Sequence, residues 1–224
     1  MNPSALIVVS FLASLQLAIG AVAAQTETAP PALAWNFDRD QPGTIPSEFS
    51  IGTLFDGRPA GDWQVLATDR AKSPPYVLAQ LMPKGAEHAY KVVLFKEVTA
   101  SDLNLEVSFL PIQGQADMGG GLIWRATDDR NYYLARANPL EQNIRVYRVV
   151  NGIRHLLQNF DQTITLKQWH TLQVSHRDCR VTIFYDDKQV FDLCDKTFHN
   201  GMIGLWTKSD AVTYFDDLRL QHVK

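Results

Sequence analysis

Hydrophobic and polar residues alternate with a period of two along much of the chain. The clearest run places Leu103, Leu105, Val107 and Phe109 between Asn104, Glu106 and Ser108. This period is typical of a β-strand with one buried face and one solvated face. No segment longer than about ten residues shows the 3.6-residue period of an amphipathic helix. The pattern therefore predicts an all-β protein.

Further short runs of the same kind predict additional strands. They lie at Trp63–Ala67, Tyr76–Leu81, Lys91–Phe95, Gly120–Arg125, Tyr132–Arg136, Ile144–Val150, Trp169–Ser175, Arg180–Tyr185, Gln189–Leu193, Met202–Thr207 and Val212–Leu220. Turn-forming pairs separate them, and Asn151-Gly152 is a strong hairpin signal because both residues tolerate positive φ. So many short strands favour two packed antiparallel sheets, a jelly-roll sandwich. With no internal repeat or composition break, residues 35–222 are predicted to form one domain.

The N-terminus carries the pattern of an export signal. Residues 5–19 are mostly apolar, and small residues follow through Ala24, which resembles a signal peptidase site. We predict a signal peptide over residues 1–24, a polar tether over 25–34, and a periplasmic or secreted protein. An uncleaved anchor is the alternative, but the apolar run is short for a span of about 20 residues. No other stretch is apolar enough to cross a bilayer.

Composition narrows the possible partners. The net charge is -3, and no basic stripe of the kind that nucleic acid requires is present. The hydrophobic content of 46% is ordinary for a globular domain.

The two cysteines, Cys179 and Cys194, flank a predicted hairpin. If Tyr185 faces Lys188 across its turn, Cys179 falls directly opposite Cys194, where the Cα atoms of such a pair lie about 5.5 Å apart. Export would permit a disulfide here. A one-residue change in the turn would separate the pair, and two free thiols are then the alternative.

The second half of the chain resembles a known family. It reads Gly119-Gly120-Gly121-Leu122-Ile123-Trp124-Arg125, Asn131-Tyr132-Tyr133-Leu134-Ala135-Arg136-Ala137-Asn138-Pro139, Asn143-Ile144-Arg145-Val146-Tyr147, Trp169-His170-Thr171-Leu172, Gly204-Leu205-Trp206-Thr207-Lys208 and Tyr214-Phe215-Asp216-Asp217-Leu218. The order and spacing resemble the 3-keto-disaccharide hydrolase-like family of bacterial exported proteins. That family belongs to the concanavalin A-like lectin/glucanase (laminin-G-like) superfamily. The resemblance implies this fold and an association with carbohydrate.

Catalytic residues are not evident in the sequence. The Glu-x-Asp-x-x-Glu strand of laminarinase-type relatives is absent, and Glu106 is the nearest candidate acid. Retaining hydrolysis needs two carboxylates about 5 Å apart, and the sequence does not show a partner for Glu106. No nucleophile elbow or phosphate-binding loop occurs.

Polar and aromatic residues on the predicted strands form a candidate ligand site. It comprises Glu106, Arg125, Tyr132, Arg136, Asn138, Arg145 and Tyr147. Aromatic faces that stack on sugar C–H groups, with planar charged groups that bond hydroxyls, suit saccharide recognition. The alternative is a solvated sheet face with ordinary charge pairs, worth less than about 1 kcal/mol each.

Two smaller features complete the candidates. Arg145, Arg148 and Arg154 form a basic patch beside Tyr147, which is either a solvated face or a contact for anionic polysaccharide. The six histidines show no metal spacing. Calcium is a possible cofactor where Asp38 meets Asp216 or Asp217.

These observations lead to three hypotheses. The first is an exported module that binds glycan on a concave sheet. The second is a glycoside hydrolase that acts on 3-keto-disaccharides or related glycans, as the resemblance implies. The third is a laminin-G-like domain that binds a protein partner.

Overall fold

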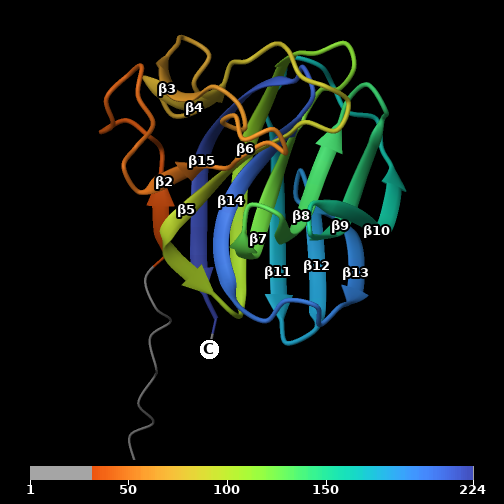
Figure 1. Cartoon of the computed structure of the whole chain (residues 1–224). Coiled ribbons are helices and arrows are strands. Elements are labelled where there is room, and N and C mark those ends of the chain that lie inside the picture. The colour runs from red at the N-terminus through yellow and green to blue at the C-terminus, as the bar shows by residue number, and fades with distance from the viewer. Residues whose placement is uncertain (1–31, 224) are drawn as a thin grey trace, which may run out of the picture.

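The computed structural model describes residues 32–223, and its strands form two antiparallel sheets packed face to face (Figure 1). The predicted all-β sandwich is confirmed. The predicted signal peptide and residues 25–31 of the predicted tether lie outside the described residues. Between residues 32 and 223, no helix is long and apolar enough to span a bilayer.

One layer is an eight-stranded sheet. Its order is β13 (Lys188–Cys194), β12 (Arg180–Tyr185), β11 (His170–Arg177), β6 (Leu103–Gln113), β15 (Val212–His222), β4 (Tyr76–Gln80) and β3 (Trp63–Ala67), and β1 (Leu33–Trp35) also pairs with β15. The prediction that residues up to 34 are a tether is therefore wrong at its end, because Leu33 and Ala34 already lie in a paired strand.

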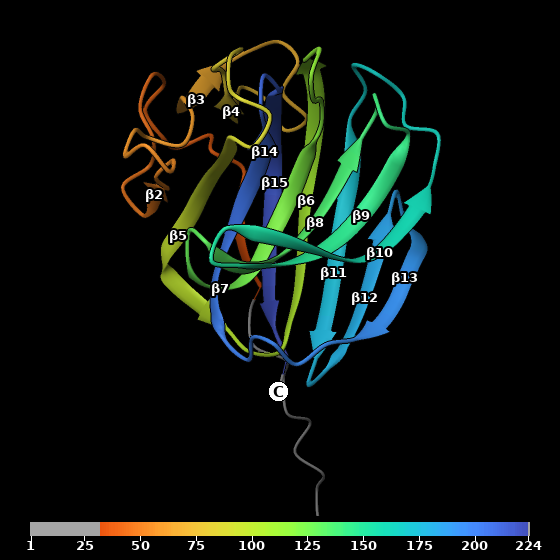
Figure 2. The same cartoon turned by 45° about the vertical axis from the view of Figure 1, so that its right-hand side comes forward.

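The other layer is a seven-stranded sheet. Its order is β10 (Ile153–Asp161), β9 (Asn143–Val150), β8 (Asn131–Asn138), β7 (Gly120–Asp128), β14 (Gly201–Lys208), β5 (Tyr90–Ala100) and β2 (Phe49–Ile51). Figure 2 shows the β9–β10 hairpin curving across the front of β7. The β9–β10 hairpin therefore covers part of the outer face of the sheet to which it belongs.

The inner faces of both sheets form the main core. The apolar residues that define the period of β6, from Leu103 to Phe109, are at most 1% exposed, whereas Asn104 and Glu106 between them are half-buried. A second, smaller apolar cluster lies on the outer face of the seven-stranded sheet and includes Ile123, Leu134 and Trp206. This sheet is therefore apolar on both faces over part of its area.

The predicted hairpin at Asn151-Gly152 is confirmed. Ile153 pairs with Val150, and the two turn residues have φ values of 52° and 78°. Positive φ at both positions is the requirement of a type I′ turn.

A disulfide joins Cys179 and Cys194, with the Cα atoms 4.7 Å apart. Tyr185 does face Lys188, but an irregularity between Ile183 and Phe184 shifts the register, so that Cys194 lies opposite Arg180. The prediction that Cys179 lies directly opposite Cys194 was thus wrong by one residue. The bridge forms diagonally across the hairpin.

Strand β10 was absent from the sequence prediction. It is an edge strand with a register shift between Leu156 and Gln158, and most of its side chains are exposed or half-buried. An edge strand of this kind has no strict period of two, so the sequence pattern contains no signal for it.

Candidate functional site

Five of the predicted ligand residues share the outer face of the seven-stranded sheet. Tyr132, Arg136 and Asn138 come from β8, and Arg145 and Tyr147 come from β9. Their neighbours along both strands, such as Ala135 and Val146, belong to the main core. Successive residues of a strand point to opposite faces, so these five point away from the core. Arg136 lies directly opposite Arg145 across the strand pair.

Glu106 does not belong to this group, and its placement there was wrong. It lies on β6, which pairs with β11 and β15 in the eight-stranded sheet. Its nearest cation is Arg219, with 3.9 Å between the charged atoms. The chain changes sheets between β6 and β7, so neighbours in sequence became members of different layers.

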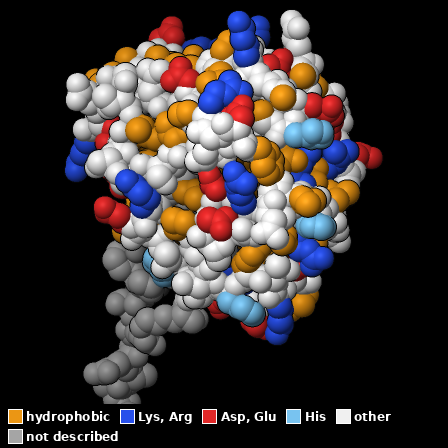
Figure 3. Space-filling view, viewed as in Figure 1, with side chains coloured by type: hydrophobic (Ala, Val, Ile, Leu, Met, Phe, Trp, Pro, Cys, Tyr) orange, Lys and Arg blue, Asp and Glu red, His pale blue; other side chains and the backbone are white. Residues whose placement is uncertain are grey.

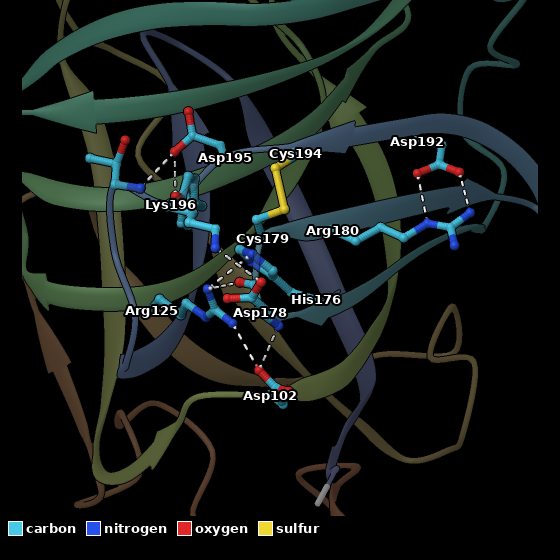
Figure 4. Close-up of a disulfide and its surroundings, with 12 residues drawn as sticks. Asp102, Arg125, His176, Asp178, Cys179, Arg180, Asp192, Cys194, Asp195 and Lys196 are labelled. Atoms are coloured by element: carbon cyan, nitrogen blue, oxygen red, sulfur yellow. Dashed lines mark hydrogen bonds and ion pairs between the residues drawn. A yellow bond between two sulfur atoms is a disulfide. The ribbon is translucent and has the colours of Figure 1, made fainter.

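Arg125 was also misplaced. It has a φ of 48°, where the pairing of β7 with β8 shifts register, and its side chain is 1% exposed. Its guanidinium donates to the carbonyl oxygens of Ser101 at 2.7 Å and Phe198 at 2.9 Å. It also forms an ion pair with Asp102 at 3.1 Å. Figure 4 shows this group beside the disulfide. Arg125 therefore holds loops together and is not free for a ligand.

A charged cluster occupies one end of the outer face. We define it as Asp117, Arg136, Asn138, Glu141, Asn143, Arg145 and Lys208. Glu141 lies 2.8 Å from Arg136 and 2.9 Å from Arg145, and so bridges two strands. Asp117 pairs with Lys208 at 3.2 Å. Each of these charged groups pairs with a group of opposite charge, because an unpaired charge is costly to bury.

The two carboxylates of the charged cluster differ in acidity. Burial raises the pKa of Asp117 above its ordinary value, although Lys208 works against this. Partial burial also opposes ionisation of Glu141, but Arg136 and its neighbours outweigh burial and lower the pKa of this carboxyl. The face therefore carries one acid that holds its proton more strongly than usual and one that holds it less strongly.

An aromatic groove adjoins the charged cluster. Its volume is about 600 Å³, and it is lined by Phe55, His88, Tyr90, Tyr147, Gly152, Ile153, Arg154 and Leu156. Tyr147 links the two regions, because it stands on the same face of β9 as Arg145. Figure 3 shows apolar, basic and acidic side chains interspersed on the face of the molecule that Figure 1 views.

Arg154 reaches from β10 over the aromatic rings of this groove. Its guanidinium carbon lies 4.8 Å from the ring centre of Tyr90, 5.0 Å from that of Tyr147 and 5.8 Å from that of Trp206. Such cation–π contacts contribute about 0.5–2 kcal/mol each. They hold the β9–β10 hairpin against β14 and β5.

Two buried polar atoms lie beneath this layer without a hydrogen-bond partner among the described residues. They are the hydroxyl of Tyr132 and the indole nitrogen of Trp206. Burial raises the pKa of Tyr132, so the hydroxyl keeps its proton. The indole of Trp206 is close enough to this hydroxyl to oppose the effect of burial, so the two groups are polar neighbours of one another.

Sequence reasoning missed Phe55 and Tyr90 as site residues. Phe55 lies in a turn after β2 and Tyr90 begins β5, far in sequence from β9. Two residues of the groove had a signal in the sequence: Tyr147 as a predicted ligand residue and Arg154 as a member of the predicted basic patch. That patch is divided in the structure, since Arg148 forms an ion pair with Asp195 at 3.2 Å.

The acids considered for calcium make other contacts. Asp38 accepts a hydrogen bond from the backbone of Tyr76, and Asp216 accepts one from the backbone of Ser73. Asp217 accepts one from the hydroxyl of Ser73. Within residues 32–223, no group of three or more acidic, histidine or cysteine residues is arranged to hold a metal ion.

Comparisons with known proteins agree with the fold. No protein-family model matches the chain. Levanase of Bacillus subtilis (strain 168) is 24% identical over 128 residues, which is 56% of this chain but 18% of levanase. The chain therefore spans a small part of that enzyme.

Solved structures with the same type of fold match this chain at low sequence identity. The carbohydrate-binding module CBM66 from Bacillus subtilis has a TM-score of 0.63 and 19% identity, and the match covers 78% of this chain and 95% of the module. A GH43 protein from Bacillus licheniformis has a TM-score of 0.58 and 15% identity, covering 85% of this chain and 39% of that protein. At these identities the likeness shows the fold alone. It confirms the concanavalin A-like sandwich, while membership of the 3-keto-disaccharide hydrolase-like family stays a prediction.

Proposed function

We propose that this chain is an exported glycan-binding module whose ligand site is the outer face of the seven-stranded sheet. The observation that carries the proposal is the continuity of two surfaces on that face. The aromatic groove presents Tyr90 and Phe55, and the adjoining charged cluster presents Glu141 and Arg145. Apolar ring faces next to a few fixed polar groups are the usual composition of a small-ligand site.

Accessibility within this face supports the proposal. Phe55 is 67% exposed, so its ring can meet a sugar, whereas Tyr90 is half-buried between Arg154 and Trp206 and supports the wall of the groove. Glu141 and Arg145 are 37% and 32% exposed at their side chains. The low-identity likeness to CBM66 is compatible with this function but does not locate the site.

Binding to a glycan array, followed by calorimetry with the best ligand, tests the proposal. Replacement of Phe55 or Tyr90 with alanine is expected to weaken binding about two- to tenfold, since an aromatic contact is worth about 0.5–1.5 kcal/mol. Phe184→Ala is the matched control, because Phe184 is half-buried on the outer face of the other sheet. Absence of binding on the array, or equal loss in all three variants, would contradict the proposal.

A second candidate function is hydrolysis of 3-keto-disaccharides. The observation in its favour is that Asp117 and Glu141 lie in one charged cluster around Arg136 and Asn138, and that their pKa values are shifted in opposite directions there. Acid and base pairs of glycosidases show this divergence. The resemblance of the second half of the sequence adds to it.

Turnover of a 3-keto-disaccharide, followed by chromatography, tests this candidate. Asp117→Asn and Glu141→Gln are each expected to abolish turnover. Glu106→Gln is expected to leave it unchanged, since Glu106 lies on the other sheet. If the wild type shows no turnover while it binds glycans, hydrolysis is rejected and binding stands.

A further inference from the structure

Arg154 differs from the other arginines of the seven-stranded sheet in its partners. Arg125, Arg136, Arg145 and Arg148 each form an ion pair with an aspartate or glutamate. Among residues 32–223, Arg154 has neither an acidic partner nor a side-chain hydrogen bond, and its contacts are the three aromatic rings. A half-buried arginine without a counter-charge on a groove wall is the feature that needs an explanation.

The contacts of Arg154 with the three rings leave its N–H donors without an acceptor among the described residues. A guanidinium carries five N–H donors in the plane of the group, and none of those of Arg154 is used in a side-chain hydrogen bond there. Those donors match the two oxygens of a carboxylate or sulfate in a bidentate contact. The rings of Tyr90 and Tyr147 therefore orient Arg154 without consuming its hydrogen-bonding capacity.

The rest of the groove lining also lacks a negative charge that could neutralise Arg154. None of its eight residues is acidic, and His88 is also exposed there. Two acids line the adjoining pockets: Asp56, which pairs with Arg58 at 2.5 Å, and Asp129. The carboxylate of Asp129 accepts a hydrogen bond from the backbone of Thr53 at 2.6 Å and lies 3.9 Å from Arg130. Both acids are engaged elsewhere, so they do not neutralise Arg154.

The apolar part of the lining fits a sugar ring. Phe55, Ile153 and Leu156 are 67%, 63% and 53% exposed. Large apolar side chains left exposed together are typical of a binding surface. A volume of about 600 Å³ lies within the usual range of ligand pockets, about 300–1,000 Å³.

We infer that the aromatic groove is selective for acidic saccharides, with the carboxylate of a uronic acid or the sulfate of a sulfated sugar bound by Arg154. The sugar ring lies against Phe55 and Ile153, and the anionic group meets the N–H edge of the guanidinium. This inference rests on the proposed function and adds the class of ligand.

Matched ligands that differ only in charge test the inference. We would measure binding of oligogalacturonate and its methyl ester, and of a sulfated galactan oligosaccharide and its desulfated form, by calorimetry at constant ionic strength. We expect at least one acidic form to bind tenfold or more tightly than its neutral counterpart. The pair that shows the difference identifies the source of the anion.

Variants separate a specific contact from general attraction. Arg154→Gln is expected to remove the preference for the acidic form, and Arg154→Lys to retain part of it. Arg219→Gln removes the same charge from the exposed surface of the other sheet and is expected to keep the full preference. Equal affinity for both members of each pair, or equal loss in the Arg154 and Arg219 variants, overturns the inference and leaves the proposed function intact. Failure to bind any glycan on the array overturns both.

Discussion

The indole nitrogen of Trp124 donates a hydrogen bond to Nδ1 of His176 at 2.9 Å. Trp124 belongs to β7 of one sheet and His176 to β11 of the other, so this bond joins the two layers through the core. An indole N–H can only donate, and the imidazole nitrogen that accepts it carries no proton. His176 is therefore neutral in the folded protein.

Protonation of His176 is expected to destabilise the fold. Burial, assisted by the nearby charge of Arg125, lowers the pKa of His176 from 6.5 to about 4. Between these values the unfolded chain binds more protons than the folded protein, so stability falls as the pH drops through about 6.5 and the loss is complete near pH 4. The whole difference corresponds to about 3 kcal/mol.

Comparison of the wild type with His176→Asn isolates this effect. Burial raises the pKa of Asp216 to about 6, which has the opposite slope because that carboxyl favours the folded state when protonated. Asp216 is common to both proteins and cancels in the difference. The advantage of the wild type in urea denaturation is expected to shrink between pH 7 and pH 4. An advantage that does not change with pH would contradict the neutral, buried state of His176.

Removal of Arg125 is expected to cost stability without affecting glycan binding. Its side chain is buried and bonds Ser101, Phe198 and Asp102. Asp102 is 34% exposed, so loss of the ion pair costs less than loss of a fully buried one, and the hydrogen bonds of the charged guanidinium contribute about 1.5–3 kcal/mol each. Thermal unfolding of Arg125→Ala measures the loss, and calorimetry below its melting temperature measures the affinity. A variant that keeps its melting temperature but loses affinity would return Arg125 to the ligand site.

Reduction of the disulfide is expected to weaken the fold. Cys179 and Cys194 are 15 residues apart, and a loop of about this length is stabilised by about 3 kcal/mol on closure. Urea denaturation with and without dithiothreitol gives the difference. The double variant Cys179→Ser, Cys194→Ser should match the reduced wild type and should not respond to dithiothreitol.

Gly119 is expected to tolerate no side chain. Its φ is 130°, and a Cβ atom there would overlap the carbonyl oxygen of Ala137 in the adjacent strand. Backbone strain and this overlap should together cost about 3 kcal/mol or more in Gly119→Ala. Gly43→Ala is the control, since Gly43 also has positive φ but open space around its Cα, and about 1 kcal/mol is expected there. Similar losses in both variants would show that packing against Ala137 is unimportant.

The local pattern of apolar and polar residues was sufficient to predict the strands that have one buried face. The alternation in β6 and the turn at Asn151-Gly152 are properties of a few adjacent residues, and both occur in the structure as predicted. The shared face of Arg136 and Arg145 was also predictable, because consecutive antiparallel strands lie side by side. Strand β10 was not, since an exposed edge strand imposes no period on its sequence.

The sequence by itself determined most of the strands, the sandwich and the group of polar residues on β8 and β9. The tertiary structure decided which sheet each strand joined, and so it removed Glu106 from that group and turned Arg125 inward. It also created the aromatic groove from Phe55, Tyr90 and Arg154, which lie in three separate segments. The physical reason is that side-chain direction follows from a local period of two, whereas sheet membership and grooves follow from pairing and packing between distant residues.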